Sequence, residues 1–220
     1  MVTNLNDDVK NIKNKVIEIV DGLVVANNLV LEALSDCNTE KFSTAKSNIQ
    51  NITKRTNDID NDIVRVLALY NPEAKDLRQV VSYFKITNEL LRATTSTRSF
   101  IKGFTEVCSD MDVKLINEYA IPMQKSTATA VKLVKDMMDI DCIDELQDTY
   151  NEILIEENKT DDLYEMVEKS LLIQAKESDD FEKFHNMLKA LRKSEKIADR
   201  AISIANLLLY VKVGGSLHQN

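Results

Sequence analysis

The sequence predicts an all-α protein with six long helices, arranged as two antiparallel three-helix bundles side by side. The chain has only four glycines and two prolines in 220 residues, so few residues interrupt a helix. Apolar side chains recur at three- and four-residue spacing over long stretches, which is typical of amphipathic helices. Short polar segments separate these stretches, which favours antiparallel neighbours. A spectrin-like rod and a single elongated bundle would satisfy the same pattern.

Each predicted helix is bounded by polar, glycine or proline residues. The six helices are expected at about residues 4–34, 40–70, 72–107, 110–140, 142–176 and 180–213. Pro122 lies inside the fourth segment and predicts a kink, because proline lacks the backbone N–H that a helix needs. Two helices joined at a short turn recur in each half, so we expect two domains, residues 1–107 and 108–220, related by duplication.

Charge and cysteine content limit the classes of function. The net charge is −8, which argues against nonspecific binding of nucleic acids or anionic membranes. Residues 1–108 carry 14 basic and 14 acidic side chains, so the whole acidic excess lies in residues 109–220. The widely spaced Cys37, Cys108 and Cys142 suggest reduced thiols rather than a disulfide framework. Together with the lack of a signal-peptide pattern or a transmembrane stretch, this predicts a cytoplasmic protein without membrane insertion.

Two pairs of acids interrupt the apolar stripes of the last two predicted helices. The stripe of the fifth helix reads Tyr150, Ile153, Glu157, Asp161, Tyr164, Val167 and Leu171. The stripe of the sixth reads Leu188, Leu191, Glu195, Asp199, Ile202, Ala205 and Leu209. Acids four residues apart face the same side of a helix, and here that side should face the bundle interior.

The two acid pairs are also expected at one level of the bundle. In an antiparallel hairpin, the position numbers of two residues that face each other across the helices add up to the same value at every level. The numbers of Glu157 and Asp199 add up to the same value as those of Asp161 and Glu195. The implied turn falls in the polar segment 176–180. Four buried carboxylates must be relieved by a cation, shared protons or water. An all-oxygen site suits Mg²⁺, Ca²⁺ or Mn²⁺, and carboxylate-bridged iron also fits.

Two sequence motifs carry a resemblance to a known family. Pro72-Glu73-Ala74-Lys75-Asp76-Leu77-Arg78 resembles the Pro-x-Ala-x-Asp-Leu-Arg signature of PhoU proteins, the bacterial regulators of phosphate signalling. Glu195-Lys196-Ile197-Ala198-Asp199 resembles the Glu-Arg-Ile-Gly-Asp motif of that family. The resemblance covers roughly residues 5–215. It implies two three-helix bundles, each with acid motifs that bind iron, zinc or other divalent ions in some members.

The first half departs from the family pattern. The positions that match its acid motifs hold Ile49, Thr53, Leu91 and Thr95. None of these is a carboxylate, although Arg92 keeps the arginine of the motif. The resemblance therefore implies that the first metal site is lost. The second would bind a divalent metal or iron through Glu157, Asp161, Glu195 and Asp199.

The resemblance also implies a function for the whole chain. It predicts a non-enzymatic regulator of phosphate uptake that contacts a phosphate ABC transporter ATPase and a sensor histidine kinase, with a homodimer as a further expectation. Two alternatives stay open: a carboxylate-bridged helical metalloenzyme and a metal-free helical adaptor. The enzyme is disfavoured because neither of the two histidines, His185 and His218, lies in the Glu-x-x-His context that such enzymes use.

Overall fold

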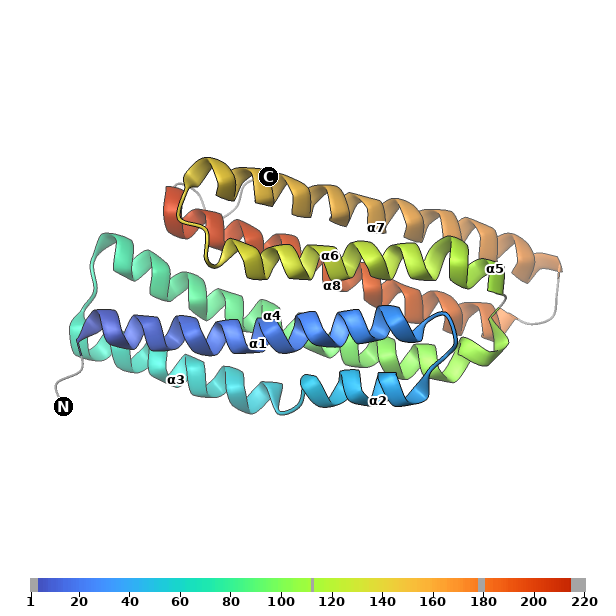
Figure 1. Cartoon of the computed structure of the whole chain (residues 1–220), viewed down its shortest axis with the longest axis horizontal. Helices are drawn as coiled ribbons and strands as arrows, with labels where there is room; N and C mark the ends of the chain where they lie inside the picture. The colour runs from blue at the N-terminus through green and yellow to red at the C-terminus, as the bar shows by residue number, and fades with distance from the viewer. Residues whose placement is uncertain (1–3, 112, 178–180, 215–220) are drawn as a thin grey trace.

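The computed structural model describes residues 4–111, 113–177 and 181–214, and within these residues it contains helices and no strand (Figure 1). The α-helices are α1 (Leu5–Ala33), α2 (Thr39–Asn48), α3 (Ile52–Tyr70), α4 (Ala74–Val107), α5 (Val113–Leu115), α6 (Ile121–Met137), α7 (Ile143–Glu177) and α8 (Phe181–Val213). A 3₁₀ turn at Cys108–Asp110 and a π-helical turn at Ile116–Ala120 flank α5. The predicted all-α fold class is confirmed.

The helices form two three-helix bundles that lie side by side (Figure 1). One bundle contains α1, α4 and the segment formed by α2 and α3, and the other contains α6, α7 and α8. The bundles meet where α4 packs against α8 and α1 packs against α6. Among the described residues, no helix combines the length and the apolar character that crossing a membrane requires.

The second predicted helix is broken, so its expected continuity over residues 40–70 is wrong. Residues 49–51 form a turn in which Asn51 has a φ of 56°, in the left-handed region that asparagine tolerates better than most residues. The break turns the buried side chain of Ile49 into the core. It also brings the last carbonyl group of α2 against α1 at Gly22, where a Cβ atom would lie 2.6 Å from the Asn48 oxygen.

The irregularity expected at Pro122 is a π-helical turn rather than a simple kink. Pro122 lies in the first turn of α6, directly after the five π-helical residues Ile116–Ala120. A proline removes one helical hydrogen bond and crowds the preceding turn, and a wider turn accommodates both effects. The segment 113–137 therefore continues as one run of helical turns along the second bundle.

A disulfide joins Cys37 to Cys108, so the expectation that these cysteines stay unpaired is wrong. Cys37 lies in the connection from α1 to α2, and this connection folds against the end of α4. The two Cα atoms are 6.0 Å apart, a separation that suits a disulfide. The pairing depends on this packing between segments 71 residues apart, which spacing alone does not reveal. Cys142 is free and exposed.

A buried polar network crosses from the first bundle into the second. Gln124 on α6 donates through Nε2 to Asn27 Oδ1 on α1 at 3.0 Å, and Ser194 Oγ on α8 donates to Gln124 Oε1 at 3.0 Å. Thr127 on α6 donates to the Ser194 carbonyl oxygen at 3.1 Å. All four side chains are fully buried. Breaking one bond would strand a buried polar group, so the network fixes how the three helices are rotated against one another.

Replacing Gly22 with alanine tests the close approach of α1 and α2. In an unobstructed helix this change stabilises the fold by about 0.5–1 kcal/mol. Here the new methyl group would meet the Asn48 carbonyl oxygen, so we expect the free energy of unfolding to fall by about 1–3 kcal/mol. Urea denaturation measures the change, with the exposed-helix variant Ser43→Ala as the control that should stay within about 0.5 kcal/mol. A stabilised Gly22→Ala protein would contradict the close approach.

Candidate metal centre

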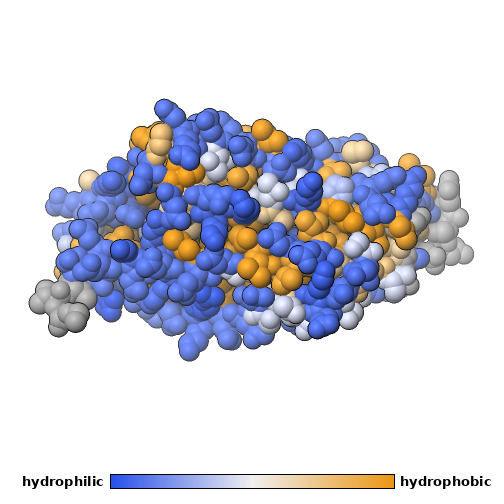
Figure 2. Space-filling view, in the orientation of Figure 1, coloured by the Kyte–Doolittle hydropathy of each residue, from blue (hydrophilic) through white to orange (hydrophobic). Residues whose placement is uncertain are grey.

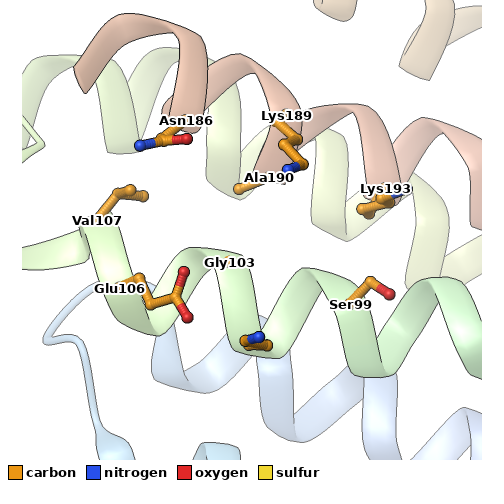
Figure 3. A pocket seen from close by; sticks show the side chains of 9 residues that line it. Ser99, Gly103, Glu106, Val107, Asn186, Lys189, Ala190 and Lys193 are labelled. Carbon is orange, nitrogen blue, oxygen red and sulfur yellow. The ribbon is translucent and has the colours of Figure 1, made fainter. Parts of the chain in front are cut away.

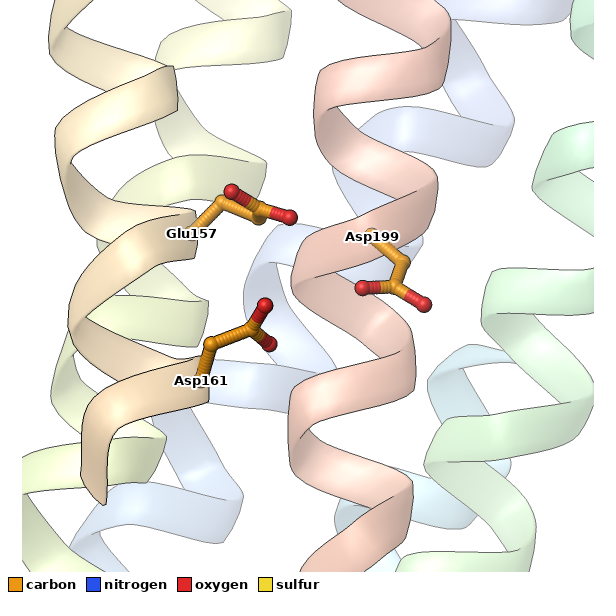
Figure 4. Close-up of side chains that lie close together, drawn as sticks. All are labelled: Glu157, Asp161 and Asp199. Carbon is orange, nitrogen blue, oxygen red and sulfur yellow. The ribbon is translucent and has the colours of Figure 1, made fainter. Parts of the chain in front are cut away.

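Three of the four predicted carboxylates converge between α7 and α8 (Figure 4). Glu157 and Asp161 extend from α7, and Asp199 extends towards them from α8. One oxygen atom from each of the three carboxylates lies within 4.8 Å of the other two. Among the described residues this is the group of acidic side chains placed closely enough to share one cation.

The hairpin geometry explains the convergence. α7 ends at Glu177 and α8 begins at Phe181, so the two helices run antiparallel from a short connection. The predicted turn residues Ser178, Asp179 and Asp180 lie outside the described residues. Apolar residues of both stripes are buried on either side of the acids, namely Ile153, Val167, Leu171, Leu191 and Ala205. The acids therefore occupy the helix seam, as their spacing predicts.

Glu195 lies beside the three converging acids rather than among them. Its side chain is 4% exposed, and its Oε1 atom accepts a hydrogen bond from Lys196 Nζ at 3.2 Å. Its Oε2 atom lies 3.3 Å from Arg192 Nε without hydrogen-bond geometry, and is thus buried without a hydrogen-bond partner. A buried carboxylate oxygen without a hydrogen bond is costly, and the ion pair with Arg192 offsets part of that cost.

Lys196 supplies a positive charge next to the acids that sequence reasoning did not assign. Its ammonium group lies 2.6 Å from Asp199 Oδ2, in addition to its contact with Glu195. Desolvation lowers the pKa of Lys196, but its hydrogen bonds to the two carboxylates outweigh that effect and raise the pKa overall. The signal was present in the sequence, because Lys196 follows Glu195 directly and precedes Asp199 by three residues.

The surroundings of these carboxyl groups disfavour their charged form. Burial raises the pKa of the Glu157 carboxyl group, and the neighbouring charges, first that of Asp161, raise it further. Burial and the charge of Asp199 raise the pKa of Asp161 and, likewise, that of Glu195. Lys196, Arg192 and Arg200 lie within 4.0 Å of the carboxylates of Glu195 or Asp199 on α8. The pKa values of Glu157 and Asp161 on α7 are raised all the same, which favours a further cation beside them.

The donor set fits a hard divalent cation. Glu157, Asp161 and Asp199 would supply carboxylate oxygens from two helices. Glu195 would add a ligand only by giving up its contact with Arg192 or Lys196. Asp161 is exposed, so an ion can reach the group from solvent. A bound ion would neutralise the acids and join α7 to α8.

Other residues considered from the sequence lie away from this centre. His185 is exposed and stacks on Phe181 with ring centroids 6.1 Å apart, near the start of α8. His218 lies outside the described residues. In the first bundle, Leu91 packs against the core and Thr95 donates to the Leu91 carbonyl oxygen at 2.8 Å, while Thr53 is exposed. These three positions and the buried Ile49 therefore supply no carboxylate ligand in the first bundle.

The fold and the centre define a protein of paired three-helix bundles with a carboxylate cluster between two helices. The family model of the PhoU domain matches residues 6–100 and 126–208, which together make up most of the chain. The chain belongs to the PhoU family, which confirms the resemblance in its sequence motifs.

Curated relatives and solved structures agree with this assignment. A "Phosphate-specific transport system accessory protein PhoU homolog" of Borreliella burgdorferi is 26% identical over 160 residues, covering 71% of each chain. A homologue with the same description from Aquifex aeolicus is 24% identical over 168 residues, covering 75% of this chain and 72% of its own. The crystal structure of PhoU from Pseudomonas aeruginosa matches with a TM-score of 0.82 at 19% identity, covering 96% of this chain and all of the other. The PhoU structure from Streptococcus pneumoniae matches with a TM-score of 0.81 at 16% identity and covers 99% of this chain and all of the other.

Removal of the Lys196 charge should strengthen cation binding. Lys196→Gln removes a positive charge that competes with an ion for Asp199 and Glu195, so we expect Mn²⁺ affinity to rise by about tenfold, which is about 1.4 kcal/mol. Without metal, the same variant should melt at a lower temperature, because its acids lose their counter-charge. Isothermal titration with Mn²⁺ and thermal melting in EDTA measure the two effects. Lys46→Gln, which removes the same charge at an exposed position on α2, is the control. Unchanged or weaker Mn²⁺ affinity in Lys196→Gln would argue against the competition.

The stability of the metal-free protein should fall as the pH rises through the raised carboxyl pKa values. Glu157, Asp161 and Glu195 hold protons to a higher pH in the folded state than in the unfolded chain, so raising the pH above about 4 favours unfolding. Denaturation in EDTA across mildly acidic to neutral pH measures the slope. Glu157→Gln/Asp161→Asn should flatten it, and an equally steep slope in that variant would show that other groups cause the dependence.

Proposed function

We propose that this protein regulates phosphate uptake and phosphate-responsive signalling through protein contacts, and that a divalent metal or iron at Glu157, Asp161, Asp199 and the adjacent Glu195 stabilises the contacting surface. Family membership supports the regulatory role, because the relatives are described as accessory proteins of phosphate-specific transport systems. The expected partners are a transporter ATPase and a sensor histidine kinase. The protein would contact these partners on the cytoplasmic side of the membrane, where ATP is available. The protein itself acts without catalysis.

The single observation that favours a contact surface is an apolar stripe on α7. Ile155, Met166 and Ile173 are 54%, 55% and 60% exposed. Their spacing of eleven and seven residues places them on one face of the helix, roughly opposite the face that carries Glu157 and Asp161. Polar residues lie between them on that face, so they would act as separate hydrophobic anchors for a partner rather than as one continuous patch.

The surface around the stripe is otherwise mixed. On the face shown in Figure 2, hydrophobic patches alternate with a mostly hydrophilic surface. α7 packs against α6 and α8, and Figure 1 shows it at the outer edge of the second bundle. A metal ion that joins α7 to α8 would therefore order the helix that presents the stripe, which couples ion binding to partner binding.

Paired surface variants test this proposal. Ile155→Ser/Ile173→Ser should weaken binding to the transporter ATPase or the sensor kinase of the same genome by at least about tenfold, because fully burying an isoleucine side chain contributes about 1.5–3 kcal/mol. Biolayer interferometry with each purified partner measures the affinity. Val64→Ser/Leu69→Ser, two exposed hydrophobic positions on α3, is the matched control.

The metal dependence is tested in the same assay. Asp199→Asn should lower metal content and melting temperature together, and should reduce the effect of added Mn²⁺ on partner affinity. If neither partner binds, or if the α7 and α3 variants weaken binding equally, the proposed contact surface is wrong. If Asp199→Asn leaves metal content and melting temperature unchanged, the metal part of the proposal is wrong while the regulatory part stands.

A further inference from the structure

A second polar site lies between the bundles, away from the carboxylate centre. α4 and α8 enclose a groove of about 280 Å³ near the carboxyl end of α4 and the amino end of α8 (Figure 3). At its base, a Cβ atom on Gly103 would lie 3.3 Å from the Cβ atom of Ala190. The small residues at this crossing let the two helices approach closely and leave a hollow between the longer side chains around them.

Three lysines line this groove without a carboxylate partner. Lys102 comes from α4, and Lys189 and Lys193 come from α8. Within the described part of the chain, none of the three forms an ion pair, although 18 ion pairs are present there. Glu106 is the one acidic side chain among the described residues of the lining, so the local charge is positive in a protein of net charge −8.

The basic residues of α8 thus divide into two groups with different surroundings. Arg192 and Lys196 contact Glu195 and the carboxylate centre. Lys189 and Lys193 instead line the groove against α4. Two lysines four residues apart on a helix repel each other, and Lys102 from the opposite wall adds a third like charge. Lys102 and Lys189 are exposed and Lys193 is half-buried, so an anion can reach all three and would relieve this repulsion.

The lining also carries neutral hydrogen-bond donors. Ser99 extends from α4 into the space between the helices, and Asn186 offers an amide group from α8 (Figure 3). Lysine ammonium groups with hydroxyl and amide donors are a typical environment for phosphoryl oxygens. At about 30 Å³ for each water molecule, the volume corresponds to roughly nine waters, which leaves room for two linked phosphoryl groups.

We propose that this groove binds a diphosphate group through Lys102, Lys189 and Lys193. The source is either inorganic pyrophosphate or the diphosphate of a nucleotide such as ADP. The inference depends on neither the metal centre nor the α7 stripe. It adds a ligand site at the junction of the two bundles, where an occupant would hold α4 against α8.

Calorimetric titration of the full chain in EDTA tests the site without a contribution from metal. Inorganic pyrophosphate and ADP are titrated separately at constant ionic strength, and at least one should bind with a Kd below about 1 mM. Lys189→Gln/Lys193→Gln should weaken that binding at least tenfold, and Lys102→Gln should weaken it on its own. Lys10→Gln/Lys46→Gln removes the same charge at exposed positions outside the groove, so it should change the Kd less than twofold. Thermal melting checks that each variant is folded.

Each result supports or overturns the diphosphate site. Tighter binding of ADP than of pyrophosphate assigns a nucleotide, and the reverse assigns free pyrophosphate. The proposal is overturned if neither anion binds to the wild-type chain, or if the control variant loses as much affinity as the groove variants. Binding of poly-glutamate without binding of either diphosphate would also overturn it and would assign the groove to an acidic peptide. A single charge reversal, Lys193→Glu, provides a second test if the double variant fails to fold.

Discussion

The buried hydrogen bonds of Gln124 are the constraint on which the position of the carboxylate centre depends. They link Asn27 of the first bundle to Ser194 of the second, and all three side chains are excluded from water. A buried polar chain of this kind tolerates little rotation, because each misplaced donor or acceptor would lose its partner. Ser194 directly precedes Glu195. The network therefore sets the rotation of α8 that directs Asp199 towards α7 and keeps Glu195 buried.

Charge explains the remaining organisation of α8. The carboxylates that face α7 repel one another, and Lys196 relieves only part of that repulsion. On a neighbouring face, Lys189 and Lys193 line the groove against α4, and neither forms an ion pair with any acid that the structure describes. α8 thus lies between two differently charged contacts: its contact with α7 carries an excess of negative charge once Glu157 and Asp161 are included, and its groove against α4 carries an excess of positive charge. Small ions of opposite sign would stabilise both faces, and each would join α8 to a different helix.

Features set by local pattern could be predicted from the sequence, and features set by contacts between distant segments could not. Apolar spacing and the scarcity of glycine and proline predicted the helices and the fold class. The position numbers of Glu157, Asp161 and Asp199 predicted that these residues would meet, because a short antiparallel hairpin fixes which residues of its two helices face each other. The break at Asn51 and the Cys37–Cys108 pair depend on tertiary packing of α1 against α2 and α4. The contact of Glu195 with Lys196 likewise depends on side-chain packing.

The central claim is that the acids of α7 and α8 hold a cation. The most direct measurement is elemental analysis of protein purified without chelators, beside the Glu157→Gln/Asp199→Asn variant. We expect about one or more equivalents of a divalent ion or iron in the wild-type protein, and a loss of that metal in the folded variant. Absence of bound metal from both proteins, even after incubation with Mn²⁺, Fe²⁺ and Zn²⁺, would contradict the claim, and so would equal metal content in the two proteins.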